Sequence, residues 1–158
     1  MSTSVVTLPD YHVACMRSVG PYGPTQIPAL WAKLLDWAQP RGFVTPARVT
    51  LGISYDNPDV TPPEKCRYDA CIVVPLDFSP EPNVNVKTIP GGKYAVAEYV
   101  GTAADIRAAW KQLLSMWMPS SGYQMDNRDC FELYRGNSYV DKDKDIFKCD
   151  ICVPVKPL

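Results

Sequence analysis

The sequence feature that most constrains the fold is an internal repeat with a spacing of about 80 residues. Four pairs of blocks keep the same order along the chain: VACMRSVG (13–20) with YAVAEYVG (94–101), WAKLLDW (31–37) with WKQLLSMW (110–117), SYDN (54–57) with LYRGN (133–137), and YDACIVV (68–74) with CDICVPV (149–155). Blocks that recur in order at nearly one offset indicate a duplicated structural unit. We predict two half-repeats, about 4–76 and 86–156, within one domain that spans 1–158.

Both halves show the same order of elements, which is a strand, a helix and then two strands. Apolar residues recur at helical spacing in 27–38 and again in 106–117, as on the buried face of an amphipathic helix. We expect strands at these positions: 5–19, 48–56 and 66–75 in the first half, and 86–100, 129–135 and 146–155 in the second. The expected fold class is α+β. Tandem βαββ half-domains would be related by pseudo-twofold symmetry around a shared ligand groove, with the helices on the outer faces.

Charge and hydropathy exclude several classes of function. The net charge is −1 and the pI is about 5.8, so we expect no direct contact with nucleic acid. No apolar run reaches about 18 residues, and the opening MSTSVVTLPD lacks the charged and apolar regions of a signal peptide. We therefore expect a cytoplasmic protein with no membrane contact.

The six cysteines do not predict a disulfide framework or a metal site. Most lie inside apolar runs of a chain without a signal peptide, which favours free, buried thiols. Cys149 and Cys152 form a single CxxC motif within an expected strand. Residues three apart in a strand point to opposite faces, so the two thiols cannot readily share one ion. We expect no metal and no cofactor.

The segment CFELYRG (130–136) carries one acid within a strand-like run. Strand alternation places Phe131 and Leu133 on one face and Glu132 and Tyr134 on the other. If the Phe131 and Leu133 face packs on the helix, Glu132 and Tyr134 face the groove between the halves. The alternative is an acid on an exposed strand face, since glutamate is rarely buried without a partner. In a groove, a desolvated carboxylate would favour a cation as its partner.

Aromatic residues at matching places in the two halves support a groove that binds cations. Tyr55 aligns with Tyr134 in the repeat, Tyr68 begins another matched strand, and Trp110 opens the second helix. An aromatic face attracts a lipophilic cation with about 0.5–2 kcal/mol. For the tryptophans that end the two helices, Trp37 and Trp117, we favour a packing role in the core.

These motifs resemble those of the GyrI-like effector-binding domains. The resemblance covers about 4–156 and lies in YDNP followed by RYD, in GGKYAVAEYVG, and in CFELYRG with CDICVPV. It implies that Glu132 pairs with cationic, lipophilic ligands and that the pocket aromatics are Tyr55, Tyr68, Trp110 and Tyr134. Some members of the family carry a helix-turn-helix domain before this unit. Since this chain begins its first strand almost at once, we expect a stand-alone module.

Three functions remain open from the sequence. The first is a binding module for amphipathic, cationic lipophilic compounds, with Glu132 as buried counter-ion and no catalytic residue; a regulator protein could then be a partner. The second, implied by the resemblance, is a protein that inhibits DNA gyrase. The third is a hydrolase of strained electrophiles that uses Glu132 with a tyrosine, because burial raises the pKa of a carboxyl group. We favour binding over catalysis.

Overall fold

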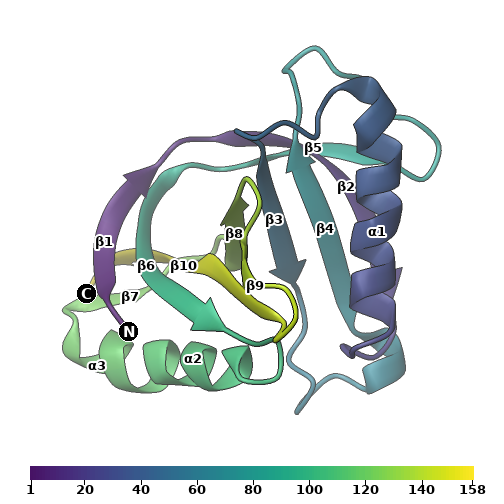
Figure 1. Ribbon diagram of the computed structural model, residues 1–158. Coiled ribbons are helices and arrows are strands. Elements are labelled where there is room, and N and C mark those ends of the chain that lie inside the picture. The colour runs from purple at the N-terminus through teal and green to yellow at the C-terminus, as the bar shows by residue number, and fades with distance from the viewer.

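The computed structural model describes residues 1–158 and contains one curled antiparallel sheet with helices packed on it (Figure 1). The strands are Thr3–Leu8 (β1), Tyr11–Val19 (β2), Val49–Ser54 (β3), Arg67–Val73 (β4), Asn85–Ile89 (β5), Gly92–Gly101 (β6), Tyr123–Met125 (β7), Phe131–Arg135 (β8), Tyr139–Asp141 (β9) and Ile146–Pro157 (β10). The helical segments are Gln26–Ala38 (α1), the 3-10 turns Gln39–Arg41 (η1) and Pro63–Lys65 (η2), Ile106–Gln112 (α2), the π-helical Leu113–Trp117 (η3) and Met118–Ser120 (α3).

The predicted fold class is confirmed, because the chain forms two βαββ halves in an α+β arrangement. Eight strands follow the order β1-β6-β10-β8-β3-β4-β2-β5, so that β8 of the second half meets β3 of the first at the centre of the sheet. The long first strand of each half is broken in two, at Pro9–Asp10 and at Pro90–Gly91. The break lets β1 pair with β6 and β5 pair with β2, so each half lends its first segment to the other.

Three clusters of buried side chains fill the molecule, one between the halves and one beneath each helix. The cluster between the halves, here called the inner core, contains Leu51, Cys71, Phe131, Leu133 and Cys152 among others. The other two clusters join α1 to the first half and α2 with η3 to the second. The sheet is therefore covered on both faces, with the inner core on one side and the helices on the other.

The two thiols of the CxxC motif lie on opposite faces of β10, as strand geometry predicts. Cys149 packs in the cluster beneath α2, whereas Cys152 belongs to the inner core. All six cysteines are free, and five of them are buried. No helix combines the length with the apolar character that crossing a membrane requires.

Candidate functional site

The strand register identifies the equivalent residues of the two halves. The repeat aligns Cys71 with Cys152, which lie at matching places in YDACIVV and CDICVPV. In the sheet, Cys71 pairs with Leu51, and Cys152 pairs with Phe131. Leu51 and Phe131 are therefore equivalent positions of β3 and β8.

The next residues along these strands are Gly52 and Glu132, and they are also direct cross-strand partners. Two residues that are both equivalent and opposite each other lie on either side of the symmetry axis. The pseudo-twofold axis therefore passes between Gly52 and Glu132, at the middle of the sheet. One half contributes a carboxylate at this point, and the other contributes no side chain.

The structure corrects the predicted orientation of β8. Phe131 and Leu133 pack in the inner core between the halves, and neither packs on a helix. Glu132 and Tyr134 consequently face the side of the sheet that bears α1 and α2. The groove with the acid at its floor lies between the two helices; the open faces of the half-sheets pack against each other as core.

Glu132 accepts hydrogen bonds from two aromatic donors. Trp110 of α2 donates its Nε1–H to Oε2 at 2.8 Å, and Tyr134 donates its hydroxyl to Oε1 at 2.7 Å. No lysine, arginine or histidine pairs with this carboxylate. All three side chains are partly exposed. The acid is thus surrounded by protein, reachable from the groove and without a counter-ion from its own chain.

Burial raises the pKa of Glu132, and the hydrogen bonds from Trp110 and Tyr134 offset part of that rise. The cause is the low polarity of the surroundings, which disfavours the ionised form. A positive charge placed beside the carboxylate would reverse this effect, since opposite charges attract strongly where water is scarce. The electrostatics of the site therefore favour a cation that the chain itself does not supply.

Trp31 of α1 occupies the place in the first half that Trp110 occupies in the second. Its Nε1–H donates to the hydroxyl oxygen of Tyr68 at 3.0 Å, and its ring meets Tyr134 edge-on, with centroids 5.9 Å apart. Tyr68 is only 5% exposed, and its hydroxyl ends over Gly52, where an added Cβ would overlap it. The two tryptophans thus approach the axis from opposite helices and bond different partners.

Tyr55 lies outside this groove, contrary to the sequence-based expectation. It packs against the inner core and donates its hydroxyl to Asp69 Oδ2 at 2.7 Å. Asp69 is 3% exposed and also accepts hydrogen bonds from Arg17, at 2.8 Å to Oδ1, and from Lys87, at 3.0 Å to Oδ2. Burial alone would raise the pKa of Asp69, but these three donors together lower it. In this cluster, which lies on the other face of the sheet, the carboxylate of Asp69 already has two cationic partners from its own chain.

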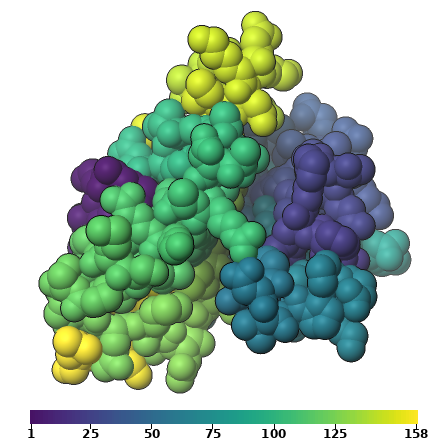
Figure 2. All heavy atoms as spheres, turned by 90° about the horizontal axis from the view of Figure 1, so that it is seen from below, coloured from purple at the N-terminus to yellow at the C-terminus, as the bar shows by residue number.

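Figure 2 shows the surface hollowed between α2 and the segment that includes α1, with the 55–66 loop along one side. Arg107 of α2 reaches this loop and pairs with Asp59 at 3.1 Å. We call the space between Trp31 and Trp110, with Glu132 at its floor, the inter-helix groove.

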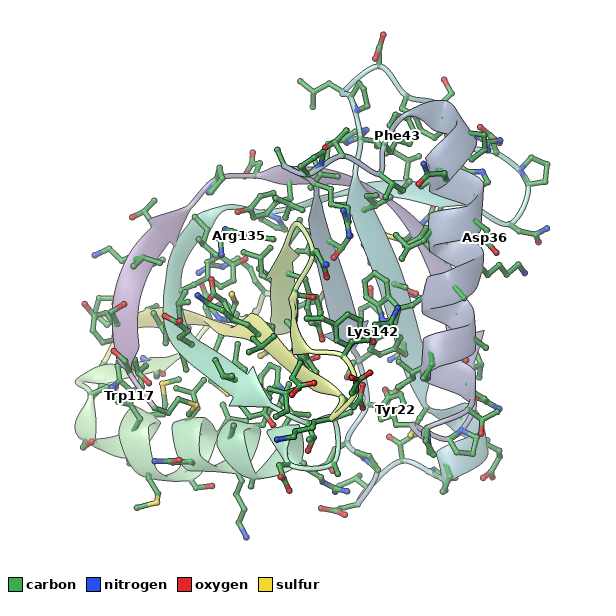
Figure 3. The ribbon with its side chains drawn as sticks, viewed as in Figure 1. Tyr22, Asp36, Phe43, Trp117, Arg135 and Lys142 are labelled. Carbon is green, nitrogen blue, oxygen red and sulfur yellow. The ribbon has the colours of Figure 1, made fainter.

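The tryptophans that end the two helical segments pack in the core, as expected. Trp117 ends η3, near the start of β1 (Figure 3), and packs on the cluster beneath α2. Trp37 packs likewise beneath α1.

Two further hollows exist away from this groove. One of about 240 Å³ lies beside Met1 and Trp117, and one of about 460 Å³ lies beside Arg17 and Asp69. Neither contains Glu132 or a tryptophan of the groove. We do not favour either hollow as the ligand site, because only the inter-helix groove combines a carboxylate that lacks a counter-ion with four aromatic side chains.

Of the five residues predicted for the site, the structure brings Glu132, Tyr134, Trp110 and Tyr68 together. Sequence reasoning left out Gly52 and Trp31. Trp31 was detectable, because it matches Trp110 in the repeat. Gly52 gave no signal of its own, because a missing side chain becomes meaningful only when the strand register shows what it faces.

Comparison with known proteins agrees with this architecture. The family profile of the GyrI-like small molecule binding domain matches residues 1–156. A DNA gyrase inhibitor of Escherichia fergusonii is 34% identical over 148 residues, which cover 92% of each chain. The EcmrR C-terminal domain superposes with a TM-score of 0.75 at 17% identity, covering 99% of this chain and 98% of that one. SAV2435 bound to tetraphenylphosphonium gives 0.60 at 16% identity, covering 99% and 94%. The two structural likenesses show a shared fold.

Proposed function

The chain belongs to the family of GyrI-like small molecule binding domains, and we propose that it binds amphipathic, cationic lipophilic compounds in the inter-helix groove. Glu132 is the counter-ion in this proposal, and Trp31, Trp110, Tyr68 and Tyr134 form the aromatic surroundings. The observation that carries it is a carboxylate that is hydrogen-bonded only by neutral donors and has no cation of its own.

The physical chemistry of the groove suits greasy cations of varied shape. A cation near Glu132 gains a Coulomb attraction that burial strengthens, and the faces of the two tryptophans can each add about 0.5–2 kcal/mol. Neither contribution demands a close steric match. The ligand in the solved structure of SAV2435, tetraphenylphosphonium, is a cation of this kind, which supports the choice of ligand class for this chain.

Titration with tetraphenylphosphonium, followed by tryptophan fluorescence, tests the proposal. Glu132→Gln removes the charge and keeps the size of the side chain, so we expect at least a tenfold loss of affinity, equivalent to about 1.4 kcal/mol. Glu98→Gln is the matched control, because Glu98 is an exposed acid that pairs with Lys148 at 3.1 Å. Equal affinity in the wild type and Glu132→Gln would rule out the counter-ion role.

A second candidate is inhibition of DNA gyrase through a protein contact. It is supported by the 34% identity with a protein named DNA gyrase inhibitor, over nearly the whole of both chains. A supercoiling assay with purified gyrase tests it, and Glu132→Gln should inhibit as well as the wild type if the contact does not use the groove. Undisturbed supercoiling at a large molar excess of the chain would exclude this function.

Hydrolysis of strained electrophiles is a third candidate, supported by the raised pKa of Glu132 and by its 2.7 Å hydrogen bond with Tyr134. A raised pKa brings a carboxyl group closer to the range in which general acids and bases work. Incubation with a panel of strained-ring compounds and product analysis by mass spectrometry tests this candidate. Multiple turnover that disappears in Glu132→Gln would favour it over simple binding.

A further inference from the structure

The two halves of the inter-helix groove offer a ligand different chemistry, although the helices that wall them are equivalent. On the second-half side, Trp110 donates to the carboxylate of Glu132. On the first-half side, Trp31 donates to the hydroxyl of Tyr68. One side therefore presents a negative charge, and the other presents a neutral hydroxyl.

The hydroxyl of Tyr68 has an unused proton. Its oxygen accepts the Nε1–H of Trp31 at 3.0 Å, and no main-chain or side-chain group of the protein accepts a hydrogen bond from it. The side chain is 5% exposed, and burial together with the nearby charge of Glu132 raises the pKa of this hydroxyl, so it remains protonated. A buried donor without an acceptor is costly, so an acceptor that reaches this hydroxyl gains binding energy there.

Gly52 leaves the space that the Tyr68 hydroxyl occupies. An added Cβ would overlap the hydroxyl oxygen of Tyr68 and lie 3.1 Å from its Cζ, so only glycine leaves room for the ring to end over β3. Gly52 is also the direct cross-strand partner of Glu132. The Cβ positions of such paired residues lie about 4.5–5.5 Å apart. Because the Tyr68 hydroxyl overlaps the Cβ position of Gly52, the donor and the carboxylate lie within the span of one small ligand.

We infer that the first-half side of the groove, formed by Tyr68 over Gly52, is a hydrogen-bond donor subsite, and that the preferred ligand class is a monocation carrying an uncharged hydrogen-bond acceptor near its charge. This inference rests on the proposed function and adds the second recognition element to it. Tyr68 is thereby the specificity-determining residue, and Trp31 is a positioning residue that turns its proton toward the ligand.

A matched pair of probes tests the inference. Butyltriphenylphosphonium and (2-methoxyethyl)triphenylphosphonium have the same charge and chain length, but only the second carries an ether oxygen. We expect the wild-type protein to bind the ether about fivefold more tightly, the effect of one hydrogen bond. In Tyr68→Phe the preference for the ether should disappear, because the donor is lost.

Tyr99→Phe is the control for loss of a tyrosine hydroxyl, because the Tyr99 hydroxyl donates to Thr102 O, outside the groove. It should keep the preference for the ether. Thermal unfolding of each variant, compared with the wild type, identifies loss of binding that is due to loss of fold.

The outcomes separate this inference from the proposed function. Equal affinity of the wild type for both probes, with binding that is lost in Glu132→Gln, would overturn the donor subsite and leave the cation site in place. A preference for the ether that persists in Tyr68→Phe would also overturn it. Failure of both probes to bind the wild type would overturn the inference together with the function on which it rests.

Discussion

Gly52 and Glu132 are direct partners across the central strands and are also each other's equivalents in the duplicated halves. A faithful duplication would place two acids at this point, a few ångströms apart. Like charges directly opposite in a sheet are destabilising, and a second side chain would overlap Tyr68. The departure from symmetry thus gives the groove one negative charge and room for the Tyr68 hydroxyl beside it.

Substitution of Gly52 by alanine should destabilise the protein by about 1–3 kcal/mol, the usual range for overpacking. The new Cβ would overlap the Tyr68 hydroxyl, so the ring must shift and its bond with Trp31 must break. Tyr68→Phe in the same chain should recover part of this loss, because the nearest remaining atom is Cζ at 3.1 Å. Urea unfolding of the two single variants and the double variant measures the coupling.

Gly23→Ala is the control for that series. No heavy atom lies within 4 Å of a Cβ at Gly23, so its free energy of unfolding should stay within about 0.5 kcal/mol of the wild type. Equal destabilisation by Gly23→Ala and Gly52→Ala would contradict a specific clash at the axis.

The pH dependence of stability should change in Glu132→Gln. Burial raises the folded-state pKa of Glu132 above its usual 4.5, so the folded chain binds its proton more tightly than the unfolded chain. Its ionisation therefore removes stability as the pH rises from about 4.5 through the folded pKa. The stability of Glu132→Gln relative to the wild type should therefore increase as the pH rises from 4 to 8. A constant difference over that range, measured by urea unfolding, would contradict the raised pKa.

Trp110→Phe should shift the pH dependence of cation binding upward. The Trp110 hydrogen bond stabilises the ionised form of Glu132, and its removal leaves the pKa of the carboxyl higher. The cation needs the ionised carboxylate. As the pH is lowered, the binding of tetraphenylphosphonium should therefore weaken at a higher pH in Trp110→Phe than in the wild type. Titrations that begin at neutral pH and extend downward until binding is lost give the midpoint. Trp117→Phe is the control, because Trp117 ends η3, away from the groove. An unchanged midpoint would show that the indole N–H does not tune the acid.

Asp69→Asn should cost about 2 kcal/mol at neutral pH, because a buried carboxylate that accepts charge-assisted hydrogen bonds is lost. The folded-state pKa of Asp69 is lowered below 3.8, so its contribution is full above that value and disappears as the pH falls through the folded pKa. The deficit of the variant should shrink toward pH 2–3 in urea unfolding. Asp150→Asn should cost less, since this equivalent residue is more exposed and its side chain pairs only with Arg135. Equal costs would contradict the role assigned to the network.

The architecture could be predicted because the internal repeat is visible in the sequence. Which face of β8 points toward the helices could not be predicted. Strand alternation separates Phe131 and Leu133 from Glu132 and Tyr134, but it does not say which face meets a helix. Both faces of β8 are covered, one by the inner core and one by the helix side. The apolar pair could therefore be assigned to either side on sequence grounds.

The misplacement of Tyr55 has a different cause. Sequence blocks align Tyr55 with Tyr134 at an offset of 79, whereas the sheet register, at an offset of 80, aligns Ser54 with Tyr134. A shift of one residue in a strand moves a side chain to the opposite face. Tyr55 consequently joins Asp69, away from the groove. An alignment based on similar letters can be wrong by one residue, and that error is enough to change which residues share a site.

The exchange of first strands between the halves means that neither half is a self-sufficient folding unit. With β1 bound to β6, and β5 bound to β2, removal of either half leaves the other with an unpaired ladder and an uncovered inner core. The walls of the groove, one from each half, are held together by main-chain hydrogen bonds as well as by side-chain packing. The sheet therefore fixes the spacing of the two walls, so that adaptation to ligands of different shape, which the proposed function requires, falls to the rotamers of the aromatic side chains.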